Sequence, residues 1–246
     1  DGDLGGAAWF SWQEGLLFGD AEVKASALAS GVLVAPNFDE LLRVQGLLFS
    51  FSKASPSEAK TVRIVQALQN SGHPVIALTS RGSEYYYMTL RELLRNGYNL
   101  ARTAVLTNAF YQPTVPYETD TVVAKYGFEA GRVKDLKLDK KAKTIQYRDG
   151  TILSSGQHKG VILKIFLAES GFTPKAIVFV DDLSKHTSRV QEAFENVPAI
   201  DVTTIHYTHL KPRVDAFSKS DKSEVITQWN AMKRSFEEGN PETIHT

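Results

Sequence analysis

The chain contains no cysteine among its 246 residues. This absence excludes disulfide bonds, cysteine metal sites and a thiol nucleophile. It leaves the cellular compartment open, because reduced cytosolic proteins and cysteine-free exported proteins both fit it.

The chain also has no long apolar run and no excess of charge of one sign. No stretch of 18 apolar residues occurs, so we expect no membrane-spanning helix. The 28 basic residues balance the 28 acidic ones. A net charge of zero gives no indication of nucleic-acid binding, and we expect no nucleic-acid partner.

The chain begins without methionine, and its first residues, DGDLGG, lack the basic and apolar regions of a signal peptide. We therefore expect that Asp1 is not the natural start. With 42% hydrophobic residues, the chain has enough apolar material for a sizeable core. Its length fits one large domain or a core with an insertion.

Apolar periodicity and turn residues predict alternating helices and strands. The first expected turn is at Pro36-Asn37, and Ser55, Pro56 and Glu58 form a favourable helix start. The expected helices are 8–29, 38–50, 55–72, 84–96, 156–171, 184–195 and 221–237. The expected strands are 74–79, 101–107, 176–180 and 201–207, with a β-hairpin over 133–153.

This alternation predicts an α/β fold with a parallel sheet covered on both faces. Ligands of such sheets bind at the carboxyl ends of the strands. The polar residues that follow two of the apolar strands are therefore candidates for a site. They are Thr79, Ser80 and Arg81 after one strand, and Asp181 and Asp182 after another.

The acid pair in IVFVDDLSKH is unusual at the end of an apolar strand. Two adjacent carboxylates repel each other, more strongly where water is scarce. Either a positive group compensates them or they are exposed. Lys185 could form an ion pair with them. Alternatively, the two aspartates have no ligand and simply form a turn or cap the helix that follows.

Three motifs follow one another along the chain: Thr79 in VIALTSRG, Lys159 in GQHKGVILKIFL, and the acid pair in IVFVDDLSKH. Over roughly 55–207, this order resembles the haloacid-dehalogenase-like (HAD) phosphohydrolase superfamily. These segments, together with LGGAAWFSWQ and TTIHYT, also resemble the bacterial DUF2608 family of unknown function. That resemblance implies a bacterial origin and is compatible with export to the periplasm.

The resemblance implies a Rossmann-like three-layer sandwich and a Mg²⁺-dependent phosphatase that acts through an aspartyl-phosphate. Asp181 and Asp182 would hold Mg²⁺, and Lys159 would neutralise the phosphate and orient the nucleophile. Thr79 would donate to a phosphate oxygen, and Ser80 and Arg81 would contact the substrate. The expected substrate is a small phosphorylated molecule or a phosphoprotein.

The resemblance also requires an aspartate nucleophile in a D-x-D motif after a first strand. Asp1-Gly2-Asp3 fits poorly, because no apolar strand precedes it. We expect the nucleophile upstream of residue 1. The alternative is a catalytically inactive HAD-like binding or interaction protein, which could be an exported bacterial factor.

The stretch between Thr79 and Lys159 is longer than a simple strand–helix–strand link requires. The segment 108–155 is therefore a candidate cap over the site, and the helical segment 7–50 is a second one. Caps select substrates and exclude water. No His-rich spacing makes His158 or His186 an expected metal ligand. The chain contains neither the G-x-G-x-x-G motif after a strand nor the G-x-x-x-x-G-K-[ST] motif, which are the glycine-rich motifs of nucleotide-binding proteins.

Overall fold

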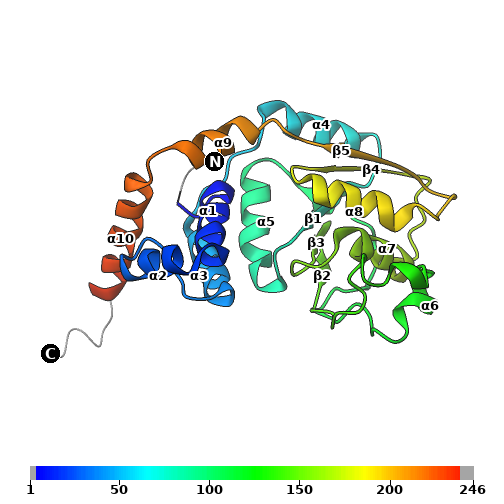
Figure 1. The fold of residues 1–246 in the computed structure, drawn as a ribbon. Coiled ribbons are helices and arrows are strands. Elements are labelled where there is room, and N and C mark those ends of the chain that lie inside the picture. Colours follow the sequence, from blue (N-terminus) through cyan, green and yellow to red (C-terminus); the bar gives the residue numbers. More distant parts are fainter. Residues whose placement is uncertain (1–3, 239–246) are drawn as a thin grey trace. The chain divides into compact units, whose positions relative to one another are not determined.

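The computed structural model describes residues 4–238, which divide into two compact units (Figure 1). One unit combines the chain up to Ala54 with the chain from His209 onward, and the other runs from Ser55 to Thr208. The two candidate cap segments, 7–50 and 108–155, therefore fall in different units. In the described range, no helix is long and apolar enough to cross a membrane.

The first unit is helical throughout its described part. Its helices are α1 (Ala7–Phe18), α2 (Ala21–Ala29), α3 (Phe38–Phe51), α9 (Lys211–Lys219) and α10 (Ser223–Glu238). The single helix expected over 8–29 is wrong, because the chain breaks at Asp20. The Asp20 side chain accepts hydrogen bonds from Glu22 N at 2.8 Å and Val23 N at 3.3 Å, and so caps a new helix.

A buried glutamine helps to hold the first unit together. Gln13, fully buried on α1, donates from Nε2 to Val32 O at 2.9 Å and accepts from Val34 N at 3.0 Å. The side chain thus satisfies the backbone of the link between α2 and α3. Trp9 is buried beside it, and Trp12 packs edge-on against Phe217 with ring centroids 6.3 Å apart. Both tryptophans therefore contribute to the packing of this unit.

The second unit contains the strands and the remaining helices. Its helices are α4 (Ala59–Asn70), α5 (Tyr86–Arg95), α6 (Val122–Tyr126), α7 (Lys159–Ser170) and α8 (Ser184–Phe194), with short 3₁₀ turns at Ser83–Tyr85, Leu100–Thr103 and Ala130–Arg132. Its strands are β1 (Ala77–Thr79), β2 (Gln146–Arg148), β3 (Thr151–Leu153), β4 (Ala176–Asp181) and β5 (Asp201–His206).

The strands form two small sheets. β1 runs parallel to β3, and β3 runs antiparallel to β2, which gives the order β1-β3-β2. β4 and β5 run parallel in register from Ala176↔Asp201 to Asp181↔His206. The α/β class and the parallel pairing agree with the sequence prediction, but the strands do not join into one sheet within residues 4–238.

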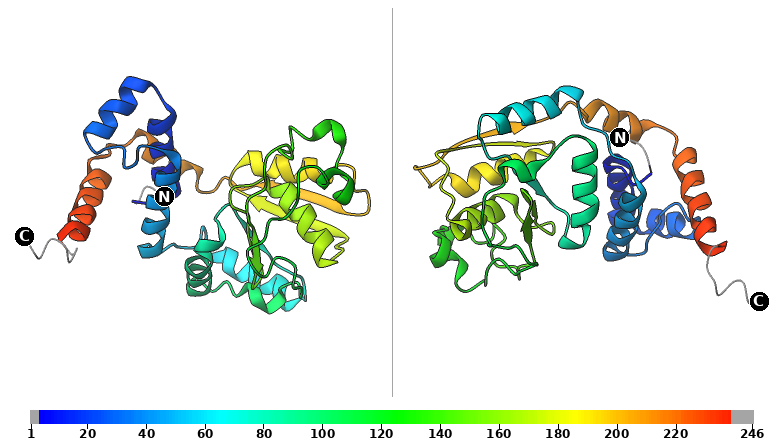
Figure 2. Two further views of the ribbon diagram at one scale, coloured as in Figure 1. Left: turned by 90° about the horizontal axis from the view of Figure 1, so that it is seen from below. Right: turned by 180° about the vertical axis from the view of Figure 1, so that it is seen from behind.

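Helix α7 forms the centre of this unit. Val161, Ile162, Ile165 and Phe166 are each at most 1% exposed. A helix that is apolar on all sides is a core helix. Strands of both sheets contribute side chains to the core around it, among them Leu78 of β1 and Phe179 of β4. Figure 2 shows α7 beside α8, with α8 packed against β4 and β5.

The described residues cover only one face of the β4–β5 sheet. Ile177 and Phe179 of β4 point into the core, whereas Val178 is 66% exposed and Val180 is 52% exposed on the opposite face. Successive side chains of a strand point to opposite faces, which explains the alternation. The continuous apolar run therefore does not mean burial on both sides here.

Three local predictions are wrong. The segment 101–107 is not a strand: it begins with the 3₁₀ turn, and Leu106 is 96% exposed. The hairpin expected over 133–153 is confined to β2 and β3 around the turn at Asp149-Gly150, because the preceding residues form irregular turns. Ser55 does not cap a helix, since α4 begins at Ala59 with Glu58 in the cap position.

The other expected elements are confirmed with small shifts of boundary. The expected helices over 38–50, 84–96, 156–171, 184–195 and 221–237 correspond to α3, α5, α7, α8 and α10. The expected strands over 176–180 and 201–207 correspond to β4 and β5, whereas only the last three residues of 74–79 form β1. Helix α9 was not expected.

Candidate functional site

A buried ion pair lies at the carboxyl end of β4. Lys159 Nζ donates to Asp181 Oδ2 at 2.6 Å, and the two side chains are 9% and 7% exposed. Asp181 Oδ1 accepts from Leu183 N at 3.0 Å. Lys159 is the first residue of α7 and Asp181 is the last residue of β4. The fold thus brings together two predicted site residues that lie 22 positions apart.

The Lys159–Asp181 ion pair explains in part how two adjacent carboxylates are tolerated at the end of β4. The Lys159 ammonium compensates the charge of Asp181 directly, while Asp182 is exposed to solvent. The backbone oxygen of Asp182 lies 3.1 Å from His206 Nε2. Lys185 is exposed as well. The positive group beside the acids therefore comes from α7, and one of the two carboxylates remains accessible.

Thr79 lies at the end of β1, and the loop that leads to α7 holds its carbonyl group. Thr79 O accepts from Ser154 N at 2.9 Å and from Ser154 Oγ at 2.7 Å. Ser154 comes directly after β3, five residues before Lys159. Thr79 Oγ1 accepts from Arg81 N at 3.3 Å. Within the described chain, no recorded hydrogen bond joins Thr79 to Lys159 or Asp181.

Ser80 and Arg81 lie in the exposed turn after β1. Arg81 O accepts from Ser155 N at 3.0 Å, so the same loop between β3 and α7 holds this turn too. The predicted site residues therefore form two groups. Lys159 and Asp181 are in buried contact. Thr79 ends β1, Ser80 and Arg81 follow it, and this second group is hydrogen-bonded to the loop between β3 and α7.

Two buried histidines next to the ion pair were not predicted as site residues. His158 caps α7 by accepting from Val161 N through Nδ1 at 3.2 Å, and His186 lies in the first turn of α8. Burial and the charge of Arg189 lower the pKa of His158 to about 4. Burial and the charge of Lys159 lower the pKa of His186 to about 4. Both rings are therefore neutral at pH 7.

No group of three or more His, Asp or Glu side chains that could hold a metal occurs among residues 4–238. Asp1 and Asp3, the candidate D-x-D residues, lie outside the described residues.

The comparisons with known proteins place the chain in a family. The family model described as "Protein of unknown function (DUF2608)" matches residues 1–242. The chain belongs to the DUF2608 family. No curated protein and no solved structure matches it. The DUF2608 assignment confirms the finer of the two resemblances noted in the sequence.

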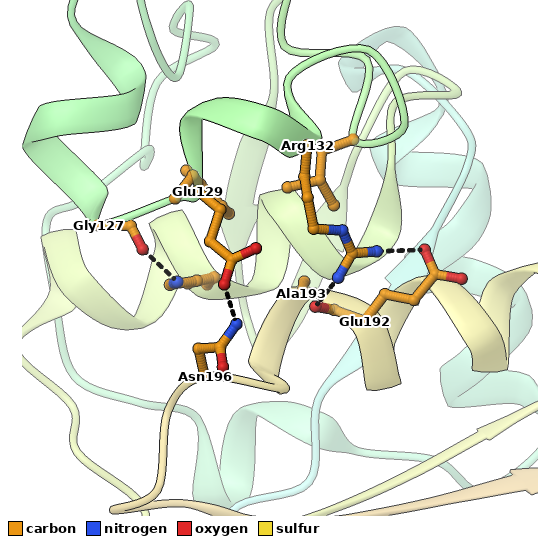
Figure 3. Close-up of a pocket in the computed structure, with 9 residues that line it drawn as sticks. Gly127, Glu129, Arg132, Glu192, Ala193 and Asn196 are labelled. Carbon is orange, nitrogen blue, oxygen red and sulfur yellow. Dashed lines mark hydrogen bonds and ion pairs between the residues drawn. The ribbon is translucent and has the colours of Figure 1, made fainter.

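A small hollow in the second unit of this DUF2608 protein lies apart from the candidate residues (Figure 3). It offers about 20 Å³, room for a water molecule or two. Arg132 pairs at its rim with Glu192 at 3.3 Å, and Lys164 Nζ donates to Gly127 O at 3.1 Å. Its charged groups have partners within the fold, and we assign no ligand to it.

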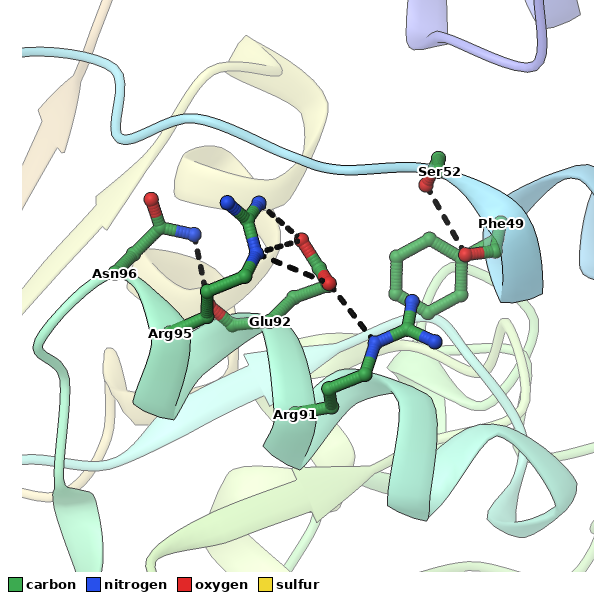
Figure 4. Close-up of polar contacts among 6 residues, drawn as sticks. All are labelled: Phe49, Ser52, Arg91, Glu92, Arg95 and Asn96. Carbon is green, nitrogen blue, oxygen red and sulfur yellow. Dashed lines mark hydrogen bonds and ion pairs between the residues drawn. The ribbon is translucent and has the colours of Figure 1, made fainter.

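Helix α5 carries a second group of charged residues (Figure 4). The buried Glu92 carboxylate accepts from Arg95 Nη2 at 2.6 Å and from Arg91 Nε at 2.9 Å. In the first unit, Ser52 Oγ donates to Phe49 O at 3.0 Å where α3 ends. Both sets of contacts satisfy polar groups locally, and we assign no ligand to either.

Proposed function

We propose that this DUF2608 protein is a Mg²⁺-dependent phosphatase of the HAD-like type. It hydrolyses a phosphomonoester through an aspartyl-phosphate whose aspartate lies in a D-x-D motif upstream of this chain. The observation that carries the proposal is the buried contact between Lys159 and Asp181. Two residues from motifs in the HAD order meet at the end of a strand and the start of a helix.

The chemistry of Lys159 suits this function. An ammonium group has three N–H donors, and Asp181 accepts from one of them. The start of α7 adds a positive helix end, which favours a phosphate group. Phosphoryl transfer depends mainly on positioning and on electrostatic stabilisation of the transferred group. Lys159 would neutralise the phosphate, and the exposed Ser80 and Arg81 would contact the substrate.

The acid pair fits Mg²⁺. This ion prefers carboxylate oxygens and retains several of its waters, so a cage of protein ligands is not needed. Asp182 is exposed, and Asp181 lies beside it with its charge held by Lys159. When bound, Mg²⁺ would supply Lewis-acid stabilisation of the phosphate oxygens. Asp181 and Asp182 would hold the ion.

Unpaired strand edges support an upstream nucleophile strand. Asp201 N donates to Lys175 O and Tyr207 N donates to Asp181 O, so the odd-numbered residues of β4 pair with β5. In a parallel sheet, the backbone groups of Val178 and Val180 then point to the other edge. No strand pairs with that edge among residues 4–238.

Strand β1 also has an edge with which no strand of the described chain pairs. Ala77 N donates to Gly150 O, and Thr79 O accepts from Ser154 N, both on the β3 side. Leu78 therefore directs its backbone groups away from β3. One parallel strand between β1 and β4 would join the two sheets in the order β2-β3-β1-strand-β4-β5. Its carboxyl end would lie beside Lys159, where the proposed nucleophile is needed, and the joined sheet would make the Rossmann-like sandwich.

Hydrolysis of an aryl phosphate tests the proposal in protein expressed with the coding sequence that precedes Asp1. We expect Asp181→Asn and Asp182→Asn each to lower the Mg²⁺-dependent rate by about a hundredfold or more. Asp201→Asn is the matched control, because Asp201 is an exposed carboxylate at the opposite end of the same sheet. Full activity in Asp181→Asn would refute the proposal.

The alternative is a catalytically inactive HAD-like protein that binds a phosphorylated partner. The closed Lys159–Asp181 pair favours it, because Asp181 needs no metal to be neutralised. Such a protein would bind inorganic phosphate in a Lys159-dependent way, with no turnover and no response to Mg²⁺. Titration calorimetry with phosphate, with and without Mg²⁺, separates the two functions.

A further inference from the structure

The two backbone carbonyl groups of the acid pair are both held from the end of β5. Tyr207, the residue after β5, donates from its backbone N to Asp181 O at 2.9 Å. His206 Nε2 lies 3.1 Å from Asp182 O. A carbonyl oxygen can only accept a hydrogen bond, so the proton of this contact is on Nε2. Two consecutive residues at the end of β5 therefore hold two consecutive residues at the end of β4.

His206 also orients a peptide group that contacts the Asp181 side chain. The carbonyl of Asp182 and the N–H of Leu183 belong to one planar peptide group. Its N–H donates to Asp181 Oδ1 at 3.0 Å, while its oxygen accepts from His206. A rotation of this peptide group would break the bond to the Asp181 carboxylate. The imidazole of His206 opposes that rotation.

Tyr207 is anchored in turn by a residue that is distant in the sequence. Its hydroxyl group donates to Glu58 Oε1 at 2.6 Å, although 149 positions separate the two residues. Glu58 occupies the cap position of α4, yet its side chain makes no capping hydrogen bond to that helix. The other carboxylate oxygen, Oε2, pairs with Lys60 at 2.9 Å. The carboxylate at the start of α4 thus holds the end of β5.

These contacts bear on the acid pair because both carboxylates are carried by the backbone that they hold. Asp181 is fixed through its side chain by Lys159 and through its carbonyl by Tyr207. Asp182 has an exposed side chain, and its carbonyl is held by His206. Side chains that bind a ligand need a supporting set of contacts that fixes their geometry. The end of β5 provides such contacts for the acid pair.

We propose that His206 and Tyr207 are positioning residues for the acid pair. They hold the carbonyl groups of Asp182 and Asp181, and Glu58 anchors Tyr207 for this purpose. That the positioned carboxylates serve a Mg²⁺ ion rests on the proposed function. The hydrogen-bonded support itself does not depend on it.

Amide hydrogen exchange, measured by NMR in the 246-residue chain, tests the role of His206. Glutamine places an amide N–H near the position of Nε2, whereas asparagine is too short to reach it. We expect His206→Asn to accelerate exchange of the Leu183 amide about fivefold, which corresponds to one hydrogen bond of typical strength. We expect His206→Gln to keep this exchange slow. Equal exchange at Leu183 in the two variants would overturn the role of His206.

The same measurement tests the anchor of Tyr207. We expect Tyr207→Phe and Glu58→Ala to accelerate exchange at the amide of residue 207 about tenfold, because the lost hydrogen bond has a charged acceptor. Glu58→Gln should keep exchange slow, since the glutamine oxygen still accepts from the tyrosine hydroxyl. The amide of Asp201 is the internal reference, because it donates to Lys175 O at the opposite end of the same strand pair.

Tyr98→Phe is the matched control for the anchor. Tyr98 OH lies 2.6 Å from Thr61 Oγ1, so this substitution removes another tyrosine hydroxyl that is bonded to α4. We expect it to leave exchange at Tyr207 unchanged. Equal acceleration at residue 207 and Asp201 in Tyr207→Phe would indicate a general loosening and overturn the anchor. Unchanged exchange at residue 207 in Tyr207→Phe and Glu58→Ala would overturn it too.

Calorimetric titration with Mg²⁺ tests the link to the acid pair in protein expressed with the coding sequence that precedes Asp1. We expect His206→Asn to bind Mg²⁺ about fivefold more weakly than the unaltered protein, and His206→Gln to bind it equally well. Equal affinity in both variants would overturn the link to Mg²⁺. If the unaltered protein binds no Mg²⁺, the proposed function fails, and the exchange rates at Leu183 and Tyr207 still decide the positioning roles.

Discussion

Substituting Lys159 by methionine tests whether the Lys159–Asp181 pair is a real buried ion pair. Methionine retains most of the apolar stem of lysine but removes the ammonium group. Asp181 would remain a carboxylate with little exposure to solvent, 7% in the intact pair, and its remaining hydrogen-bond donor within residues 4–238 is Leu183 N–H. Breaking a buried pair from one side costs about 3–5 kcal/mol, because the remaining charge stays buried. The remaining backbone hydrogen bond places the expected loss at about 3 kcal/mol.

A double-mutant cycle separates the charge effect from the loss of packing. Asp181→Asn removes the carboxylate charge, and the double variant Lys159→Met/Asp181→Asn leaves no buried charge behind. We therefore expect the double variant to be more stable than Lys159→Met alone, with a coupling energy of about 1–3 kcal/mol.

Chemical denaturation followed by far-UV circular dichroism gives the free energies of unfolding. Amide exchange in α7 localises the effect. Tryptophan fluorescence is the wrong probe, because Trp9, Trp12 and Trp229 all lie in the first unit. A loss below about 1 kcal/mol in Lys159→Met, the value typical of an exposed pair, would refute the reasoning. Strict additivity of the two substitutions would refute it too.

Three further predictions concern packing and pH. Gly160→Ala should destabilise by about 1–3 kcal/mol in denaturant titrations, since its Cβ would meet Arg189 O, whereas Gly15→Ala has open space and should stabilise by up to about 1 kcal/mol. The pKa of His158 is lowered to about 4, so on acidification the unfolded chain is protonated at this residue before the folded chain; its contribution to stability should fall by about 1.6 kcal/mol between pH 6.5 and 5, and His186, whose pKa is lowered in the same way, adds to the fall. A flat profile, or no flattening in His158→Asn, would contradict this. Gln13→Leu should lower the free energy of unfolding of the first unit by about 1–3 kcal/mol, measured by tryptophan fluorescence. No change in that free energy would contradict the importance of the two Gln13 hydrogen bonds.

Much of the second unit could be predicted from the sequence where the pattern is strong. The apolar residues of α7 and the run before Asp181 specify a buried helix and a strand without tertiary information. The segment 101–107 resembles the run before Asp181 in its apolar composition, but its apolar residues follow neither the helical nor the strand period clearly. Tertiary context made it a 3₁₀ turn and an exposed loop, which its local pattern does not encode.

The candidate site was predictable in part for the same reason. The position of Lys159 at a helix start and of Asp181 at a strand end follows from local signals. Their contact depends on how α7 and β4 pack in the core. The burial of His158 and His186 could not be predicted from the sequence, because it depends on how closely α7 packs on α8 at Gly160 and Arg189.

The most direct test of the account is phosphate release from an aryl phosphate, measured with Mg²⁺ and with EDTA. The 246-residue chain is compared with protein expressed together with the coding sequence that precedes Asp1. The account predicts Mg²⁺-dependent release in the longer protein alone, because the upstream strand supplies the nucleophile. Equal activity in both proteins would return Asp1 and Asp3 to the reaction, and no Mg²⁺-dependent release in either would contradict the proposed phosphatase.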